Sequence, residues 1–164
     1  MKEILLTQEQ VALIDDQDFE WLSKYKWHSH WNTCTRSYSA ARSVHDNGKQ
    51  KKILMHRVIM GAHPEQEVDH RNHDTLDNQR DNLRLCTAKQ NKQNVRPRTG
   101  CSSKYKGVSW HKKNHNWRTY INLNGSRYNL GSFINEIEAA HVYDGAARKL
   151  FGEFAFTNFP GGSF

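Results

Sequence analysis

Four side chains between residues 69 and 91 have the types and spacing of a phosphodiester-cleaving site. Asp69 stands beside His70, Asn82 follows twelve residues after the histidine, and Asn91 comes nine residues later. Hydrolysis requires an activated water, and a neutral histidine can take its proton. It also requires relief of charge at phosphorus and at the departing oxygen, which one divalent cation can supply. Carboxylate and amide oxygens are the ligands that such a hard cation prefers.

The order of elements around these residues suits a site built on one ion. Neighbouring strand residues point to opposite faces, so Asp69 and His70 need not compete for one position. Residues 72–81 are rich in turn formers and predict a long loop. Residues 83–87 predict a short returning strand, and residues 88–94 predict a helix that presents Asn91.

This segment resembles the HNH endonucleases, specifically their homing and phage-type branch. The resemblance rests on 68-VDH-70, 76-LDN-78, 82-NLR-84 and Asn91 with Asn94, preceded by 55-MHRVIMG-61. It implies a ββα-metal fold and Mg²⁺-dependent cleavage of DNA, with His70 as the general base. It further implies that Asp69 and Asn91 are metal ligands and that Asn82 pins the loop that orients the histidine. The third letter of the family name is Asn91 here, and an amide oxygen favours Mg²⁺ or Mn²⁺ over softer metals.

Two other histidines and the three cysteines have simpler interpretations. His56 lies in an apolar run and is interpreted as a structural histidine or a support for the site, and His73 is expected to face solvent. Cys34, Cys86 and Cys101 form no C-x-x-C pair, so we expect a reducing compartment and no structural zinc. A polar loop without catalytic function is the alternative interpretation of the whole stretch.

The distribution of charge predicts a nucleic-acid partner. The net charge is +7, yet residues 1–68 carry nine basic and nine acidic side chains, whereas residues 82–135 carry eleven Lys or Arg and no acid. Such a run, interleaved with aromatic residues, is typical of a folded surface that faces phosphates. An acidic protein or an anionic membrane surface is the alternative partner. The side chains expected to follow the DNA backbone near the cut are Arg84, Lys89, Lys92, Arg96 and Arg98.

The segment from residue 105 predicts a three-stranded sheet covered on one face by a helix. Trp117, Thr119 and Ile121 alternate with polar residues, and Asn124-Gly125 is a hairpin signal. Residues 107–110 and 127–130 are the expected neighbouring strands. Asn135 is the expected helix cap, and apolar residues from 137 to 150 recur at helical spacing. The open face of this sheet would carry Arg and Tyr side chains.

This segment resembles the plant ethylene-response-factor, or Apetala-type, DNA-binding domain. The match runs through 105-YKGVSW-110, Trp117, 130-LGSF-133 and 138-EAAHVYDGAARKLFGEFAFTNFP-160. The resemblance implies that the sheet binds the major groove of double-stranded DNA. The implied contact residues are Lys106, Ser109, His111, Arg118, Tyr120, Asn122, Arg127 and Asn129. Several of these replace plant arginines and a tryptophan, so plant sequence preferences are not transferred.

The chain as a whole is expected to be α+β. We predict an N-terminal α+β scaffold (1–66), a nuclease unit (67–95), a basic linker (96–104) and the sheet-and-helix domain (105–160). The scaffold should contain a strand at 4–7, a helix capped by Asp16 or Asp18 that reaches Tyr25, and a hairpin around 46-DNGK-49.

A site-specific DNA endonuclease is the favoured function. A DNA-binding regulator that keeps the HNH unit only as a scaffold is the alternative. No apolar stretch approaches 18 residues and no signal peptide is visible. We therefore expect no membrane association and a location in the cytoplasm of a bacterial host cell, with a phage gene as one origin. The sequence is compatible with a monomer or a homodimer and with nicking or double-strand cleavage.

Overall fold

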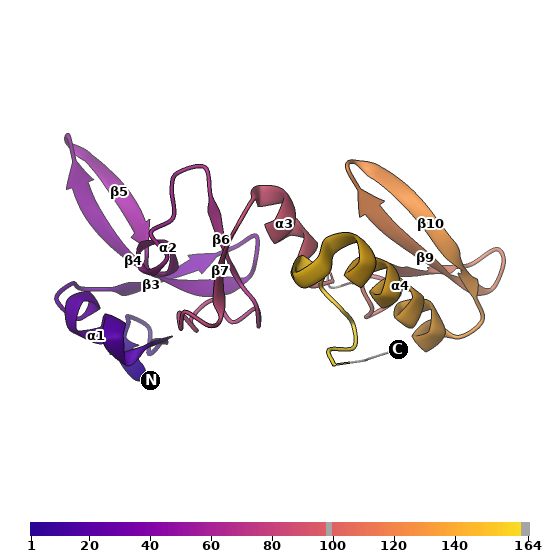
Figure 1. Ribbon diagram of the computed structural model, residues 1–164, viewed down its shortest axis with the longest axis horizontal. Helices are drawn as coiled ribbons and strands as arrows, with labels where there is room; N and C mark the ends of the chain where they lie inside the picture. Colours follow the sequence, from indigo (N-terminus) through magenta and orange to yellow (C-terminus); the bar gives the residue numbers. More distant parts are fainter. Residues whose placement is uncertain (98–99, 162–164) are drawn as a thin grey trace. The chain divides into compact units, whose positions relative to one another are not determined.

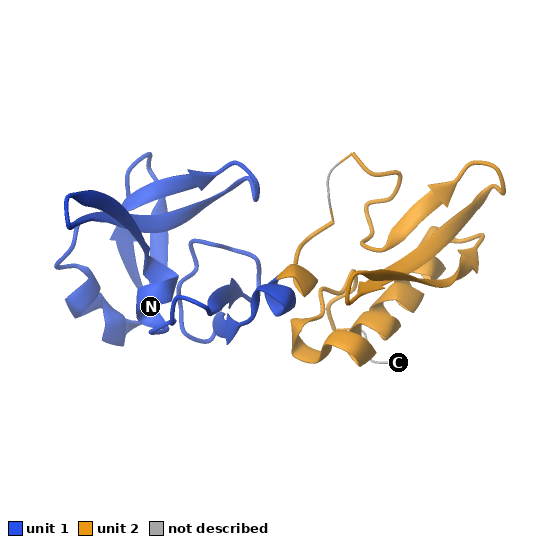
Figure 2. Ribbon diagram, turned by 90° about the horizontal axis from the view of Figure 1, so that it is seen from above, with its two compact units in different colours: residues 1–91 blue, residues 92–164 orange. Residues whose placement is uncertain are grey.

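The computed structural model describes residues 1–97 and 100–161. The chain divides into two compact units, Met1–Asn91 and Lys92–Phe164 (Figure 2). Both units combine helices with small antiparallel sheets, which confirms the predicted α+β class. Within the described ranges, none of the helices has the length and apolar character needed to cross a membrane.

Unit 1 begins with a hairpin and a short helix. Strands β1 (Lys2–Leu5) and β2 (Val11–Ile14) pair antiparallel, and α1 spans Asp16–Leu22 (Figure 1). The helix cap is Asp15, without a side-chain capping bond, so the prediction of Asp16 or Asp18 as the cap was wrong. The helix also ends at Leu22, before Tyr25, and the Leu22 carbonyl accepts from Trp27 Nε1 at 2.9 Å.

A three-stranded sheet follows, made of β3 (His28–Asn32), β4 (Ser37–Asp46) and β5 (Lys49–Leu54). The predicted hairpin between β4 and β5 is confirmed. Asn47 and Gly48 have φ angles of 49° and 75°, the left-handed pair that a type I′ turn requires. Helix α2 (Met55–Ile59) continues directly from β5.

The segment predicted to be the nuclease unit shares its core with the N-terminal segment. Strands β6 (Glu67–His70) and β7 (Leu83–Cys86) pair antiparallel, and α3 spans Ala88–Gln93, which confirms the predicted order of elements. Val68 and Leu83 pack in one buried cluster with Ile14, Leu22 and Met55. Residues 1–66 and the ββα segment up to Asn91 therefore fold as one unit.

Unit 2 contains the predicted sheet and helix. Strand β9 (Asn116–Leu123) lies between β8 (Val108–His111) and β10 (Ser126–Phe133). Helix α4 (Glu136–Phe151) packs along one face of the sheet and leads into a short 3₁₀ helix, η1 (Gly152–Phe154) (Figure 1). Asn135 is the cap as predicted, since its Oδ1 accepts from the backbone nitrogen of Ile137 at 2.8 Å.

The helix lies close to the sheet because small residues face it. Ala139 and Ala140 are fully buried, and Thr119 donates to the Ala139 carbonyl at 3.1 Å. Gly107 makes the tightest approach. A Cβ at this position would lie 2.0 Å from the Tyr143 ring, and its φ of +79° also favours glycine.

Candidate active site

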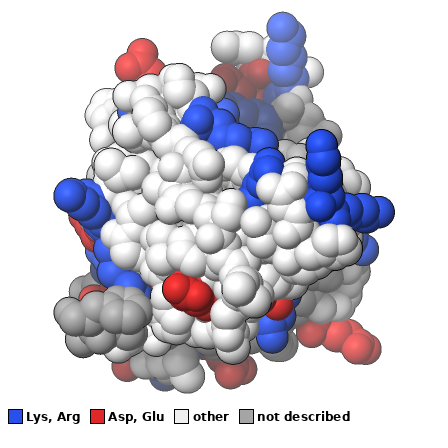
Figure 3. Space-filling view, turned by 90° about the vertical axis from the view of Figure 1, so that its right-hand side faces the viewer, with Lys and Arg blue, Asp and Glu red and all other residues white. Residues whose placement is uncertain are grey.

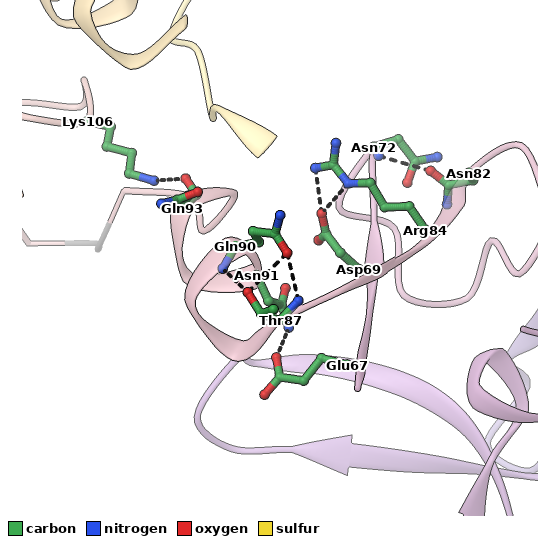
Figure 4. A network of polar contacts seen from close by, with 10 residues as sticks. All are labelled: Glu67, Asp69, Asn72, Asn82, Arg84, Thr87, Gln90, Asn91, Gln93 and Lys106. Atoms are coloured by element: carbon green, nitrogen blue, oxygen red, sulfur yellow. Dashed lines mark hydrogen bonds and ion pairs between the residues drawn. The ribbon is translucent and has the colours of Figure 1, made fainter. Parts of the chain in front are cut away.

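The carboxylate of Asp69 is buried in an ion pair. Asp69 faces Arg84 across the β6–β7 pair, and the guanidinium donates to Asp69 Oδ2 from Nε at 2.8 Å and from Nη2 at 2.6 Å (Figure 4). The side chains of Asp69 and Arg84 are 6% and 8% exposed. The structure thus places Arg84 inside the site, whereas the sequence suggested a position on the DNA backbone.

Asn91 is oriented by a residue that the sequence did not single out. Its Nδ2 donates to Glu67 Oε2 at 2.5 Å (Figure 4). Because Glu67 holds the amide nitrogen, the amide oxygen is the atom directed away from Glu67. Glu67 and Asp69 are two residues apart on β6 and share one face of the strand. Asp69 lies on this face of β6, and Asn91 is bonded to Glu67 on the same face, so both predicted metal ligands are found there.

His70 points to the opposite face of β6, where it is buried. Its ring meets the His56 ring edge to face, with centroids 5.0 Å apart and an interplanar angle of 84°. Burial lowers the pKa of His70, whereas the neighbouring Asn78 side chain and the charges of nearby aspartates, Asp69 first, raise it. Burial also lowers the pKa of His56, to about 3. Both rings are hence favoured in the neutral form at pH 7.

Asn82 spans the loop that follows His70. Its Oδ1 accepts from the backbone nitrogen of Asn72 at 3.0 Å, and its Nδ2 donates to the Asp77 carbonyl at 2.8 Å. Its backbone oxygen also accepts from Arg71 at 2.9 Å. One side chain at the end of the loop thus holds both the start of the loop, at Asn72, and its middle, at Asp77. Figure 4 shows the bond to Asn72.

The remaining polar side chains of the loop bond mainly to its own backbone. Asn72 Oδ1 accepts from the Asp74 nitrogen at 2.7 Å, and Asp74 Oδ1 accepts from the Leu76 nitrogen at 3.0 Å. Asn78 is fully buried and donates to the Leu76 carbonyl at 3.0 Å. Such side-chain turns replace a regular ladder of backbone bonds, which accounts for the density of Asn and Asp in this stretch.

The donor chemistry of the β6 face fits a hard divalent cation. Asp69 supplies a carboxylate and Asn91 an amide oxygen, which are ligands that Mg²⁺ accepts alongside water. In the described part of the chain, no three His, Cys, Asp or Glu side chains group closely enough to hold a metal. A cation would accordingly depend on these two oxygens together with water or a phosphate oxygen. The Arg84 guanidinium competes for the same carboxylate.

The other predicted backbone-binding residues differ in accessibility. Lys89, Lys92 and Arg96 are exposed, and Arg98 lies outside the described residues. Lys106 instead donates from Nζ to the carbonyls of Gln93 at 2.6 Å and Val95 at 2.7 Å. Burial lowers its pKa to about 8. The sequence predicted that Lys106 contacts DNA. In this structure its ammonium group instead donates to backbone carbonyls at the end of α3.

The other seven predicted contact residues of unit 2 lie on one face of its sheet. The register pairs Ser109 with Arg118, Tyr120 with Asn129, and Asn122 with Arg127, while the alternate residues Thr119 and Ile121 pack toward α4. The guanidinium of Arg127 lies 5.2 Å from the Tyr120 ring centroid. The seventh residue, His111, shares this face. On the side of unit 2 seen in Figure 3, Lys and Arg side chains gather toward the upper right, beside a largely uncharged centre.

Comparison with known proteins identifies the family. The family model described as HNH endonuclease matches residues 54–93. A protein of Acanthamoeba polyphaga mimivirus, named as an uncharacterized HNH endonuclease, is 34% identical over 140 residues, which cover 84% of this chain and 68% of the relative. Protein 3.8 of Escherichia phage T7 is 33% identical over 88 residues, covering 54% of this chain and 72% of the relative. The chain belongs to the HNH endonuclease family.

Proposed function

We propose that this chain is a metal-dependent, site-specific endonuclease of the homing or phage type that cuts double-stranded DNA. The observation that carries the proposal is the placement of different functional side chains on the two faces of β6. Its buried histidine faces one side, and its aspartate faces the other side together with the Glu67–Asn91 pair. We place the activity in the cytoplasm of a bacterial host cell, for a monomer or a homodimer.

His70 acts as the general base. Burial favours the neutral ring that can accept a proton from the attacking water. Asn82 holds the loop beside the histidine through the backbone of Asn72 and Asp77. His56 packs against the ring and limits its rotation.

Asp69 and Asn91 hold the cation, which is Mg²⁺ or Mn²⁺. When bound, the cation supplies Lewis-acid stabilisation of the charge that develops on the phosphate and the leaving oxygen. Glu67 orients the Asn91 amide for this role. Arg84 neutralises Asp69 and must share or release the carboxylate when the cation binds.

Unit 2 binds DNA through the open face of its sheet. Arg118, Tyr120 and Arg127 stand on that face without an acidic residue in any of its three strands. Hydrogen-bonding side chains on a sheet can read base edges in the major groove. The exposed residues Lys89, Lys92 and Arg96 add contacts to phosphates, which supply affinity more than sequence choice.

A plasmid-cleavage assay tests the proposal. The wild-type chain is expected to convert supercoiled DNA in Mg²⁺ or Mn²⁺ and to leave it intact in EDTA. H70A should lose cleavage and keep DNA binding, whereas H45A, which alters an exposed histidine of β4, should cleave normally. Equal cleavage by H70A and the wild type would contradict the assignment of the base.

The DNA-binding regulator is a second candidate, and the Asp69–Arg84 ion pair favours it. A guanidinium on the carboxylate satisfies the charge without a metal. The two functions differ in one result: binding to source DNA without metal-dependent cleavage of any DNA supports the regulator.

A further inference from the structure

A second ion pair of unit 1, between the buried Asp18 and the partly exposed Arg80, has no part in the chemistry described above. Asp18 lies in the first turn of α1 and is 2% exposed. Arg80 donates to it as a fork, from Nε to Oδ2 at 2.8 Å and from Nη2 to Oδ1 at 2.7 Å. Trp21 Nε1 adds a third bond, to Oδ1, at 3.1 Å. A two-bond guanidinium contact of this kind fixes orientation as well as distance.

The loop that contains Arg80 is joined to the N-terminal segment at further points. Leu13 donates to the Leu76 carbonyl at 2.9 Å, and Asn78 donates to the Leu13 carbonyl at 2.8 Å. The backbone nitrogen of Arg80 donates to Asp15 Oδ2 at 2.8 Å. Hydrogen bonds consequently hold residues 76–80 against strand β2 and the start of helix α1. We call residues 76–80 the docked segment.

The docked segment is also the one that contacts the histidine and its supporting asparagine. Asn78 is fully buried, and its side chain lies close enough to His70 to raise the pKa of the ring. The carbonyl of Asp77 accepts from Asn82 Nδ2 at 2.8 Å. A shift of residues 77–78 would therefore move two neighbours of the base together.

We infer that Asp18 and Arg80 are positioning residues for the cleavage reaction: their ion pair fixes the loop on the N-terminal segment and thereby holds Asn78 and Asn82 beside His70. The inference rests on the proposed endonuclease function. Neither residue touches the DNA or the cation in this role. The N-terminal strand and helix accordingly belong to the catalytic unit, although they carry none of its reacting groups.

The test uses the full chain and a charge-neutral double variant, D18N/R80Q. Removing Arg80 alone would leave a buried unpaired carboxylate and could unfold the unit. The double variant avoids this and keeps an acceptor for Trp21. The matched control is D16N in the same helix, which breaks only the exposed contact between Asp16 and the Met1 amino group. R80K keeps the charge without the fork and should recover part of the rate.

Three quantities are measured: the single-turnover rate on plasmid DNA in Mg²⁺, the Kd for the same DNA in EDTA, and hydrogen exchange in residues 72–82. D18N/R80Q should cleave about 10- to 100-fold more slowly, as expected for a displaced catalytic group, with Kd changed less than about twofold for DNA contacts left intact. Its loop amides should exchange faster, and D16N should match the wild type in all three.

Two results would overturn the inference. One is a wild-type cleavage rate for folded D18N/R80Q, and the other is unchanged loop exchange in that variant. Failure of the proposed function is separate, because it would show as no cleavage by the wild type itself. In that event the hydrogen-exchange comparison alone decides whether the ion pair fixes the loop.

Discussion

Replacing His56 with phenylalanine should make unit 1 less sensitive to acid. His56 is buried against His70, and its pKa in the folded chain is about 3, compared with an ordinary 6.5. As the pH falls below 6.5, the unfolded chain binds a proton at this ring and the folded chain does not. The stability contributed by the neutral ring is complete above pH 6.5 and is lost progressively as the pH falls toward 3.

The size of the effect follows from the two pKa values. At pH 5 the unfolded histidine is almost fully protonated while the folded one stays neutral. This difference lowers the free energy of unfolding by about 2 kcal/mol relative to pH 7.5. H56F retains a ring that can pack on His70 and removes the titration. Among the described residues no hydrogen-bond partner faces His56 Nδ1, so phenylalanine sacrifices no bond at that atom.

The assay is urea unfolding of the full chain at pH 7.5, 6.5, 5.5 and 5.0. Pulsed hydrogen exchange in β2 and α2 reports unit 1 separately from unit 2. The stability of H56F minus that of the wild type should rise by about 2 kcal/mol from pH 7.5 to pH 5. H45Q, at an exposed histidine of the same unit, should follow the wild type. Parallel pH curves for H56F and the wild type would refute the claim that His56 is buried in its neutral form.

Two further substitutions address the metal face and the packing of unit 2. R84Q leaves the buried Asp69 carboxylate without its ion pair, so the Tm of this variant in EDTA should fall. Its Tm increase on adding Mg²⁺ or Mn²⁺ should exceed the increase of the wild type and of the exposed-site control K92Q. Equal increases would contradict competition between Arg84 and the cation. G107A places a Cβ 2.0 Å from Tyr143 at a positive φ and should destabilise unit 2 by about 3 kcal/mol or more. G125A has a similar φ and open space around it, so it should cost only about 1 kcal/mol. The difference is measured by urea unfolding, and similar losses for the two variants would argue against the tight contact.

Features set by neighbouring residues were predictable from the sequence. The Asn47-Gly48 turn, the Asn135 cap and the alternation along β9 each depend on a few adjacent side chains. The order of elements around His70 and Asn91 was predictable for the same reason. Strands β2 and β3 were missed. For β2, Val11–Ile14 is too short to show a clear alternation of apolar residues, and its hydrogen-bond partners include the distant backbone of Leu76.

The misplacement of charged residues has a common physical cause. Aspartate is a residue type that often caps helices, yet the Asp18 carboxylate accepts hydrogen bonds from Arg80, which is 62 residues away in sequence. Arg84 belongs to a run without acids, yet it lies opposite Asp69 in the β6–β7 register. Composition predicts how many charges a segment carries, but only the register tells which of them pair. The same register would have drawn attention to Glu67, which shares the face of Asp69.

The histidine-bearing loop is held from both sides, and this explains why so polar a segment can position a base. On its inner side, Asn82 joins Asn72 to Asp77. On its outer side, the Asp18–Arg80 pair and the backbone of Leu13 attach it to the N-terminal segment. A polar loop that relied on its own turns would open easily, since local stability rises with buried contacts. The rigidity that a general base needs is therefore supplied by residues far from it in sequence, and substitutions in α1 should change the rate of cleavage more than the affinity for DNA.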